Sequence, residues 1–205
     1  MIDIQQIEKE LKKRLVYPYR WGRKQEDDWD SRTNFIYKTQ NFDDFLSITE
    51  GFSQELRDYA MNRWYNFWSA MAVEKIFVQH SDVVANTNPY DKLIDFSIDG
   101  IPFDHKTSVF PKNFQHPINN ALNDKVALIQ WLYKNQSQQG RKHLKNRLFI
   151  LLYETKNHQH WKLKSEIGEL KKVIDVYMDS FSRKKLKTIH PDSEKVYSDI
   201  IWFLK

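Results

Sequence analysis

The sequence contains no cysteine, which excludes disulfide bonds, thiolate zinc sites and cysteine nucleophiles. Only five of its 205 residues are glycine, and it has neither a Gly-x-Gly-x-x-Gly fingerprint nor a phosphate loop ending in Gly-Lys-Ser/Thr. No apolar run approaches the roughly 18–20 residues that cross a membrane. Residues 1–15 also lack the apolar core of a signal peptide. These absences predict an intracellular, cytoplasmic protein with no membrane partner.

Aromatic residues and positive charge are both plentiful. Seven Trp, ten Tyr and thirteen Phe suffice for the core of a single domain over residues 1–205. The net charge is +5, but residues 1–140 hold 17 basic and 19 acidic residues, whereas residues 141–205 hold 15 and 8. Basic clusters of this kind either keep a protein soluble or contact phosphates without regard to sequence. The charge distribution thus favours a polyanionic partner without establishing one.

Hydrophobic periodicity predicts helices that alternate with strands. We expect helices over residues 3–16, 53–79, 117–139 and 167–177, and strands over residues 82–85, 93–98, 101–107, 147–153 and 200–204. Ser53 is the expected N-cap of the second helix, and the nearly continuous apolar run over 147–153 is typical of a strand buried on both faces. Residues 17–50 are predicted to be irregular apart from a short helix over 43–48. This order of elements is typical of an α/β fold with a mixed central β-sheet flanked by helices.

A hairpin is predicted where Asp99-Gly100, a favoured two-residue type I′ turn, separates two strand-like segments. With these two residues as the loop, Asp95 lies directly opposite Asp104, where Cβ atoms are about 4.5–5.5 Å apart. Two like charges about 4 Å apart repel by roughly 4 kcal/mol at an effective dielectric near 20. The two carboxylates therefore need a bound cation, a shared proton or full solvation on an open face.

Side-chain alternation sorts the hairpin residues into two faces. Asp95, Asp104 and Lys106 share one face, whereas His105 falls on the apolar face and is expected to pack there rather than bind a ligand. On the preceding helix, Glu74 stands where the apolar stripe predicts an apolar side chain. Glu74 is either half-exposed at the edge of the stripe or joins the hairpin acids. In the second interpretation, three carboxylates and one lysine converge on one pocket.

This set of residues resembles the signature of the PD-(D/E)xK nucleases, which are restriction-endonuclease-like. Glu74 matches their helical glutamate, Asp95 their strand aspartate, and Asp104-His105-Lys106 their acidic-x-Lys triplet. The resemblance implies a restriction-endonuclease-like core of the order αβββαβ. That core would span residues 53–155, after an N-terminal helix and irregular arm (residues 1–52) and before a basic C-terminal helical extension with a late strand (residues 156–205).

The resemblance also implies an activity, namely hydrolysis of DNA phosphodiester bonds by an endonuclease of prokaryotic or phage type. Asp95, Asp104, Glu74 and the backbone carbonyl of His105 would hold Mg²⁺ or Mn²⁺, and Lys106 would orient or deprotonate the attacking water. A homodimer would place two such sites on the two DNA strands. Further contacts to DNA are expected from Gln130, Lys134, Arg141, Lys142, Lys145, Arg183, Lys184 and Lys185.

Two other functions remain open at this stage. The chain could be a nucleic-acid-binding protein that keeps the nuclease fold without cleavage, or a structural protein in which the hairpin acids are incidental. His158 and His160 form a His-x-His pair, which we interpret as part of a loop rather than a metal site. Trp64, Trp68 and Trp131 are expected in the core rather than as platforms for stacking bases.

Overall fold

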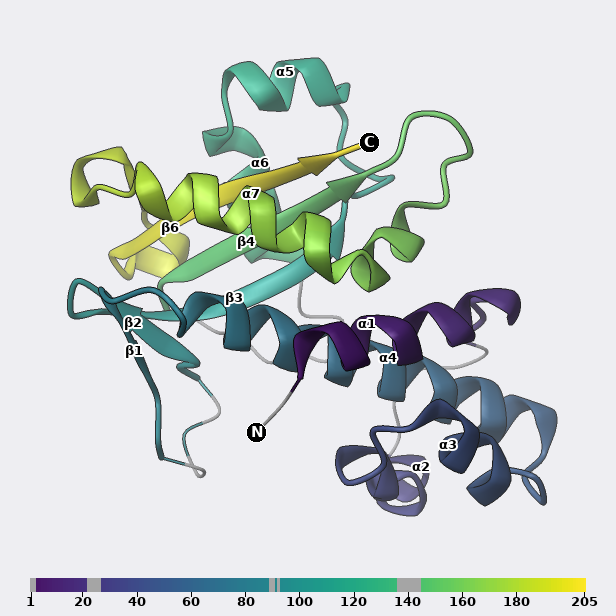
Figure 1. The fold of residues 1–205 in the computed structure, drawn as a ribbon. Coiled ribbons are helices and arrows are strands. Elements are labelled where there is room, and N and C mark those ends of the chain that lie inside the picture. The colour runs from purple at the N-terminus through teal and green to yellow at the C-terminus, as the bar shows by residue number, and fades with distance from the viewer. Residues whose placement is uncertain (1–2, 22–26, 89–90, 92, 136–144) are drawn as a thin grey trace.

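The computed structural model describes residues 3–21, 27–88, 91, 93–135 and 145–205. Over these residues, strands form one mixed sheet with helices on both of its faces (Figure 1), which confirms the predicted α/β class. The helices and strands are α1 (Ile4–Lys13), α2 (Asp27–Arg32), α3 (Phe42–Ile48), α4 (Gln54–Phe77), β1 (Val83–Ala85), β2 (Phe96–Ile98), β3 (Ile101–Val109), α5 (Ile118–Asn123), α6 (Val126–Asn135), β4 (Arg147–Tyr153), α7 (Ile167–Asp179), β5 (Lys187–Ile189) and β6 (Val196–Leu204). Two short 3₁₀ helices matter below, η3 (His160–Ser165) and η4 (Arg183–Lys185).

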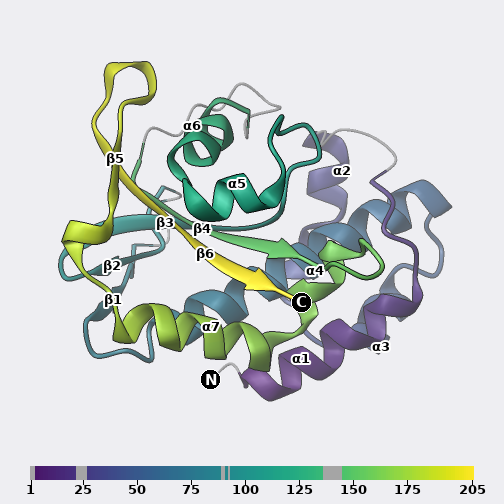
Figure 2. The same cartoon turned by 90° about the horizontal axis from the view of Figure 1, so that it is seen from above.

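The sheet has the strand order β1-β2-β3-β4-β6-β5. Strands β1, β2 and β3 form an antiparallel meander, whereas β3, β4 and β6 run parallel to one another. Figure 2 shows α5 and α6 over one face and α1, α4 and α7 over the other. Strand β4 is buried on both faces, because Ile150 packs in the core beneath α4 and Leu151 in the core beneath α6. The apolar run over residues 147–153 is therefore a central strand, as predicted.

Helix α4 supports the face of the sheet that it covers together with α1 and α7. Ser53 caps it as predicted, because its hydroxyl accepts a hydrogen bond from the Leu56 amide. Trp64 and Trp68 are buried, and both indole N–H groups donate to the carbonyl of Thr39. The two tryptophans thus belong to the core, as the sequence predicted. Because α4 packs against α1, α7 and the sheet, it holds its last turns rigidly beside β3.

Several predicted boundaries differ from the structure. The helix predicted over residues 117–139 is two helices, because Asp124 is extended and its side chain caps the amide of Val126 at 3.0 Å. The last part of that range lies outside the described residues. The stretch over 17–50 contains α2 as well as the predicted short helix, α3. The last strand begins at Val196, and the sequence analysis missed β5, whose three residues give too short a pattern to recognise.

The hairpin turn has the predicted conformation. Asp99 and Gly100 have φ angles of 49° and 74°, and the ladder pairs Phe96 with Phe103 and Ile98 with Ile101. Positive φ at both loop residues is the requirement of a type I′ turn. The predicted register is therefore confirmed between Phe96 and Phe103.

We expect Gly100→Ala to lower the free energy of unfolding by about 1–2 kcal/mol, because a Cβ atom disfavours the left-handed conformation. No packing clash contributes, since the nearest side-chain atom would lie 4.0 Å from the added Cβ. Gly51→Ala is the matched control, because it has nothing within 4 Å and no left-handed φ. Urea denaturation measures both variants, and equal stability of the two would contradict the assigned turn.

Candidate functional site

The β2–β3 ladder ends where the candidate site begins. The amide of Asp95 still donates to the carbonyl of Phe103 at 2.9 Å. The next free amide, that of His105, instead donates to the carboxylate of Asp95 at 2.7 Å. The carboxylate takes the place of a main-chain acceptor, so the two strands separate at this point. An acidic side chain is thereby fixed in the opening between them.

Three side chains meet in this opening. The ring atom Nδ1 of His105 lies 2.8 Å from Oδ2 of Asp95 and 4.0 Å from Oε1 of Glu74. The three potential ligand atoms all lie within 4.8 Å of one another. The His105 side chain is 3% exposed, whereas those of Asp95 and Glu74 are 25% and 31% exposed. The cluster therefore has a buried imidazole at its base and carboxylates that reach solvent.

The electrostatics of the cluster favour a positive charge. Burial raises the pKa of Glu74, and the negative charges of Asp95 and Asp104 raise it further. Burial opposes ionisation of Asp95, but hydrogen bonds from His105 outweigh it and lower the pKa of that carboxyl. Burial likewise opposes a charge on His105, and its contact with Asp95 outweighs burial and raises its pKa. A proton on His105 thus occupies a position that suits a cation.

The sequence predicts that Asp104 joins this cluster, but in the structure its carboxylate lies outside it. Its carboxylate accepts a hydrogen bond from Nε of Arg147 at 2.6 Å, and Arg147 is its neighbour across the parallel β3–β4 ladder. The expectation that Asp95 and Asp104 share a face assumed that the hairpin ladder continues past Phe96, and it does not. Asp104 still acts on the cluster through its charge, since it raises the pKa of both Glu74 and His105.

The ring of His105 has a second role that the sequence analysis missed. It packs as predicted, stacked on Phe96 with ring centroids 6.1 Å apart, but its Nδ1 atom also contacts Asp95. Alternation along the strand predicts which face the ring lies on, but not that the Asp95 carboxylate contacts both the amide and the ring of His105. Lys106, the next residue, is exposed, and its positive charge helps to lower the pKa of Asp95.

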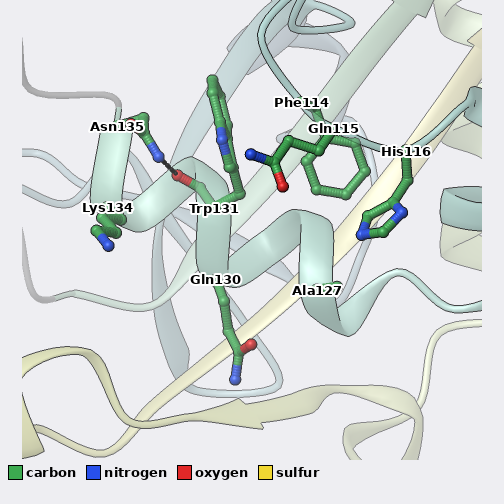
Figure 3. A pocket seen from close by; sticks show the side chains of 8 residues that line it. All are labelled: Phe114, Gln115, His116, Ala127, Gln130, Trp131, Lys134 and Asn135. Carbon is green, nitrogen blue, oxygen red and sulfur yellow. Dashed lines mark hydrogen bonds between the residues drawn. The ribbon is translucent and has the colours of Figure 1, made fainter.

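Gln130 and Lys134 lie on α6, which covers the face of the sheet opposite to α4 (Figure 2). They line an open pocket of about 370 Å³ (Figure 3), separate from the Glu74 cluster. Trp131 also lines this pocket and is only partly buried, with its ring 6.2 Å from that of Phe114. Trp131 packs against the core beneath α6 without being fully buried, so its prediction as a core residue is confirmed only in part.

The predicted basic contacts lie in two places. Arg183, Lys184 and Lys185 form the exposed helix η4, and the guanidinium of Arg183 donates to the carbonyl of Asp99 at the hairpin turn. Lys145 is exposed directly before β4, whereas Arg141 and Lys142 lie outside the described residues. The His158 and His160 pair lies in and beside a loop, as predicted, and Nδ1 of His160 accepts from the amide of Glu154 at 2.8 Å.

Lys164 is a residue of chemical interest that the sequence analysis did not identify. It lies on η3, and its ammonium donates to Oδ1 of Asn66 on α4 at 2.6 Å. Burial, aided by the positive charge of Lys106, lowers the pKa of Lys164 to about 8. Nothing in the sequence around it distinguishes this lysine from its neighbours Lys156 and Lys162. Only the packing of η3 against α4, β3 and β4 reveals it.

We expect Lys164→Met to raise the free energy of unfolding by about 1–3 kcal/mol at neutral pH, because one pKa unit is worth about 1.36 kcal/mol. A lowered lysine pKa means that the charged form destabilises the fold. That penalty is complete below about pH 8 and disappears as the pH rises from there toward 10.5. Urea denaturation at neutral and at alkaline pH measures the effect. Lys172→Met is the control, since Lys172 is exposed and paired with Glu169; a loss of stability in Lys164→Met would contradict the argument.

Comparison of the chain with protein-family models, curated proteins and solved structures finds no significant match. In the part of the chain that the structure describes, no helix combines the length and the apolar character that crossing a bilayer requires.

Proposed function

We propose that the chain is a metal-dependent nuclease of PD-(D/E)xK type that hydrolyses DNA phosphodiester bonds, acting as an endonuclease. The observation that carries this proposal is the meeting of Glu74, Asp95 and His105 within 4.8 Å at the point where β2 and β3 separate. The three residues come from a helix, a loop and a strand, and Glu74 stands 21 residues before Asp95 in the chain. Lys106 follows directly on β3, and its positive charge helps to lower the pKa of Asp95.

The order of the elements supports the proposal. From α4 to β4 the chain runs helix, three antiparallel strands, helices and a strand parallel to β3. This order is consistent with the αβββαβ order of a restriction-endonuclease-like core, in which the glutamate would lie on the first helix and the acidic residues around the second and third strands. Because fold alone does not specify activity, the proposal depends on the side chains of the site.

The donor atoms fit the proposed metal. Two carboxylates suit Mg²⁺ or Mn²⁺, which prefer oxygen ligands, and an imidazole nitrogen is more compatible with Mn²⁺ than with Mg²⁺. When bound, the metal would supply a water of lowered pKa and positive charge beside the scissile phosphate. Asp95 and Glu74 would hold it, and the contact between His105 and Asp95 would fix the orientation of that carboxylate.

The residues around the proposed metal site would contribute charge to it or orient the groups in it. Lys106 would orient the attacking water or stabilise the negative charge on the phosphate. Asp104 would contribute negative potential near Glu74, with Arg147 holding its carboxylate in place. DNA would approach this side of the sheet, with further contacts from the exposed η4 beside the hairpin turn. A homodimer is proposed as the arrangement that would cut both strands.

One observation favours the alternative, a DNA-binding protein that keeps this fold without cleaving. The carboxylate of Asp104 is engaged with Arg147 instead of facing the other acids. In that case DNA would bind through the basic residues, and the Asp104–Arg147 pair would be structural.

Incubation of supercoiled plasmid with the protein and Mg²⁺ or Mn²⁺ tests the proposal. We expect nicked or linear product that EDTA abolishes and that the Lys106→Ala variant fails to form. A salt-dependent gel shift without product under any metal would support the alternative. Absence of both product and gel shift would refute the two functions together.

A further inference from the structure

Lys164 lies on the same side of the sheet as the Glu74 cluster, in a position that lacks a negative partner. The helix η3 that carries it packs against α4, β3 and β4. Its ammonium contacts the amide oxygen of Asn66 at 2.6 Å, and no ion pair to it is found among the described residues. Partly buried lysines are ordinarily paired with a carboxylate, because an isolated charge loses hydration. The positive charge of Lys164 therefore remains uncompensated.

Two residues of β3, which η3 contacts, carry further hydrogen-bond donors. Lys106 is exposed on β3, and within the described ranges it too forms no ion pair. Thr107 has a buried hydroxyl without a hydrogen-bond partner among those residues, and its neighbour across the ladder, Ile150, packs in the core beneath α4. A hydroxyl, an amide and two ammonium groups all offer hydrogen-bond donors. Of these, the Lys164 ammonium and the Asn66 amide meet on the α4 side of the sheet, whereas the neighbour of Lys106 across the ladder, Phe149, packs in the core beneath α6.

We propose that Lys164 and Asn66 bind a backbone phosphate of the nucleic acid, on the same strand as the phosphate at the Glu74 cluster. This inference rests on the proposed function for the identity of the ligand, a phosphodiester of DNA. The cluster and the lysine are positioned by one rigid helix, since Asn66 and Glu74 are eight residues apart on α4, or roughly 12 Å along its axis. A strand held at both points would be fixed in direction across the site.

The cost of keeping Lys164 charged also favours a role in binding an anion. Burial and the charge of Lys106 both disfavour the charged form of Lys164 and lower its pKa to about 8. A phosphate placed beside the Lys164 ammonium reverses this unfavourable term, because an opposite charge stabilises the protonated form. A lysine that costs the free protein stability thereby gains a partner only when the ligand is present. This behaviour is typical of a binding site rather than of a structural lysine.

Fluorescence anisotropy with a labelled DNA duplex of about 20 base pairs, in EDTA to prevent cleavage, tests the inference. We expect Lys164→Gln to weaken binding about five- to tenfold at moderate salt and to reduce the slope of log K against log salt concentration by about 1. Lys164→Arg should retain the slope, because it keeps the charge. Lys172→Gln, on the exposed surface of α7, makes the same change in net charge and should leave both quantities near the wild-type values.

The outcomes separate this inference from the proposed function. If the wild type binds and cleaves DNA but Lys164→Gln binds with unchanged affinity and slope, the inference is wrong and the nuclease proposal stands. If DNA binding depends on Lys164 but no metal supports cleavage, the phosphate site stands and the nuclease proposal fails. An equal loss in Lys164→Gln and Lys172→Gln would indicate a nonspecific charge effect and overturn the site. Circular dichroism spectra confirm that each variant is folded.

Discussion

Replacing Asp95 with asparagine is expected to reduce cleavage on the order of a thousandfold and to remove measurable binding of Mn²⁺. The substitution keeps the size of the side chain and an oxygen acceptor for the His105 amide, so the fold should survive. It removes the negative charge that both a metal ion and the His105 ring require. Initial rates of plasmid cleavage and isothermal titration with Mn²⁺ measure the two effects.

Two matched aspartates serve as controls for this result. Asp91→Asn alters an acid only four positions upstream, whose side chain accepts from the Leu93 amide, and should change neither quantity. Asp104→Asn should weaken Mn²⁺ binding less than Asp95→Asn does, because the Asp104 carboxylate is engaged with Arg147. Stronger dependence of metal binding on Asp104 than on Asp95 would show that Asp104 is the main ligand and would contradict the assigned cluster.

The affinity for metal should depend steeply on pH. His105 has a pKa raised above its usual value of 6.5, so its proton must be displaced before a cation can sit beside Asp95. Affinity should therefore fall about tenfold for each pH unit below that raised pKa and level off above it. Titrations with Mn²⁺ between about pH 5.5 and 8.5 measure this dependence.

The contact between His105 and Asp95 also predicts how the stability of the metal-free protein depends on pH. The raised pKa of His105 gives a stabilising contribution to the free energy of unfolding. This contribution is complete below pH 6.5 and is lost as the pH rises through the folded-state pKa. The lowered pKa of Asp95 gives a second stabilising contribution, which is lost only as the pH falls below 3.8. His105→Gln should flatten both the stability and the affinity profile near neutrality. Identical profiles in wild type and His105→Gln would refute the role of this imidazole.

Local patterns predicted the parts of the fold that depend on local physics. The Asp99-Gly100 turn fixed the register of β2 against β3, and Ser53 marked the start of α4. The continuous apolar run at residues 147–153 identified β4 as a strand buried on both faces. Each of these features is set by residues close together in the chain, so it can be derived without the tertiary structure.

The details of the site depend on contacts that no local pattern contains. Asp104 pairs with Arg147 because β3 and β4 run parallel in a particular register, and helices α5 and α6 separate them in the chain. Asp95 bends toward His105 because the ladder ends one residue earlier than alternation assumed. Lys164 reaches Asn66 only because η3 returns across α4, 98 residues away in sequence. Long-range packing therefore decided which charged groups meet.

Anomalous diffraction from crystals soaked in Mn²⁺ tests the central claim most directly. The account predicts a peak at about 2.0–2.3 Å from carboxylate oxygens of Asp95 and Glu74, at the end of the β2–β3 ladder. An ordered peak only elsewhere, or none there at a Mn²⁺ concentration that supports cleavage, would contradict it.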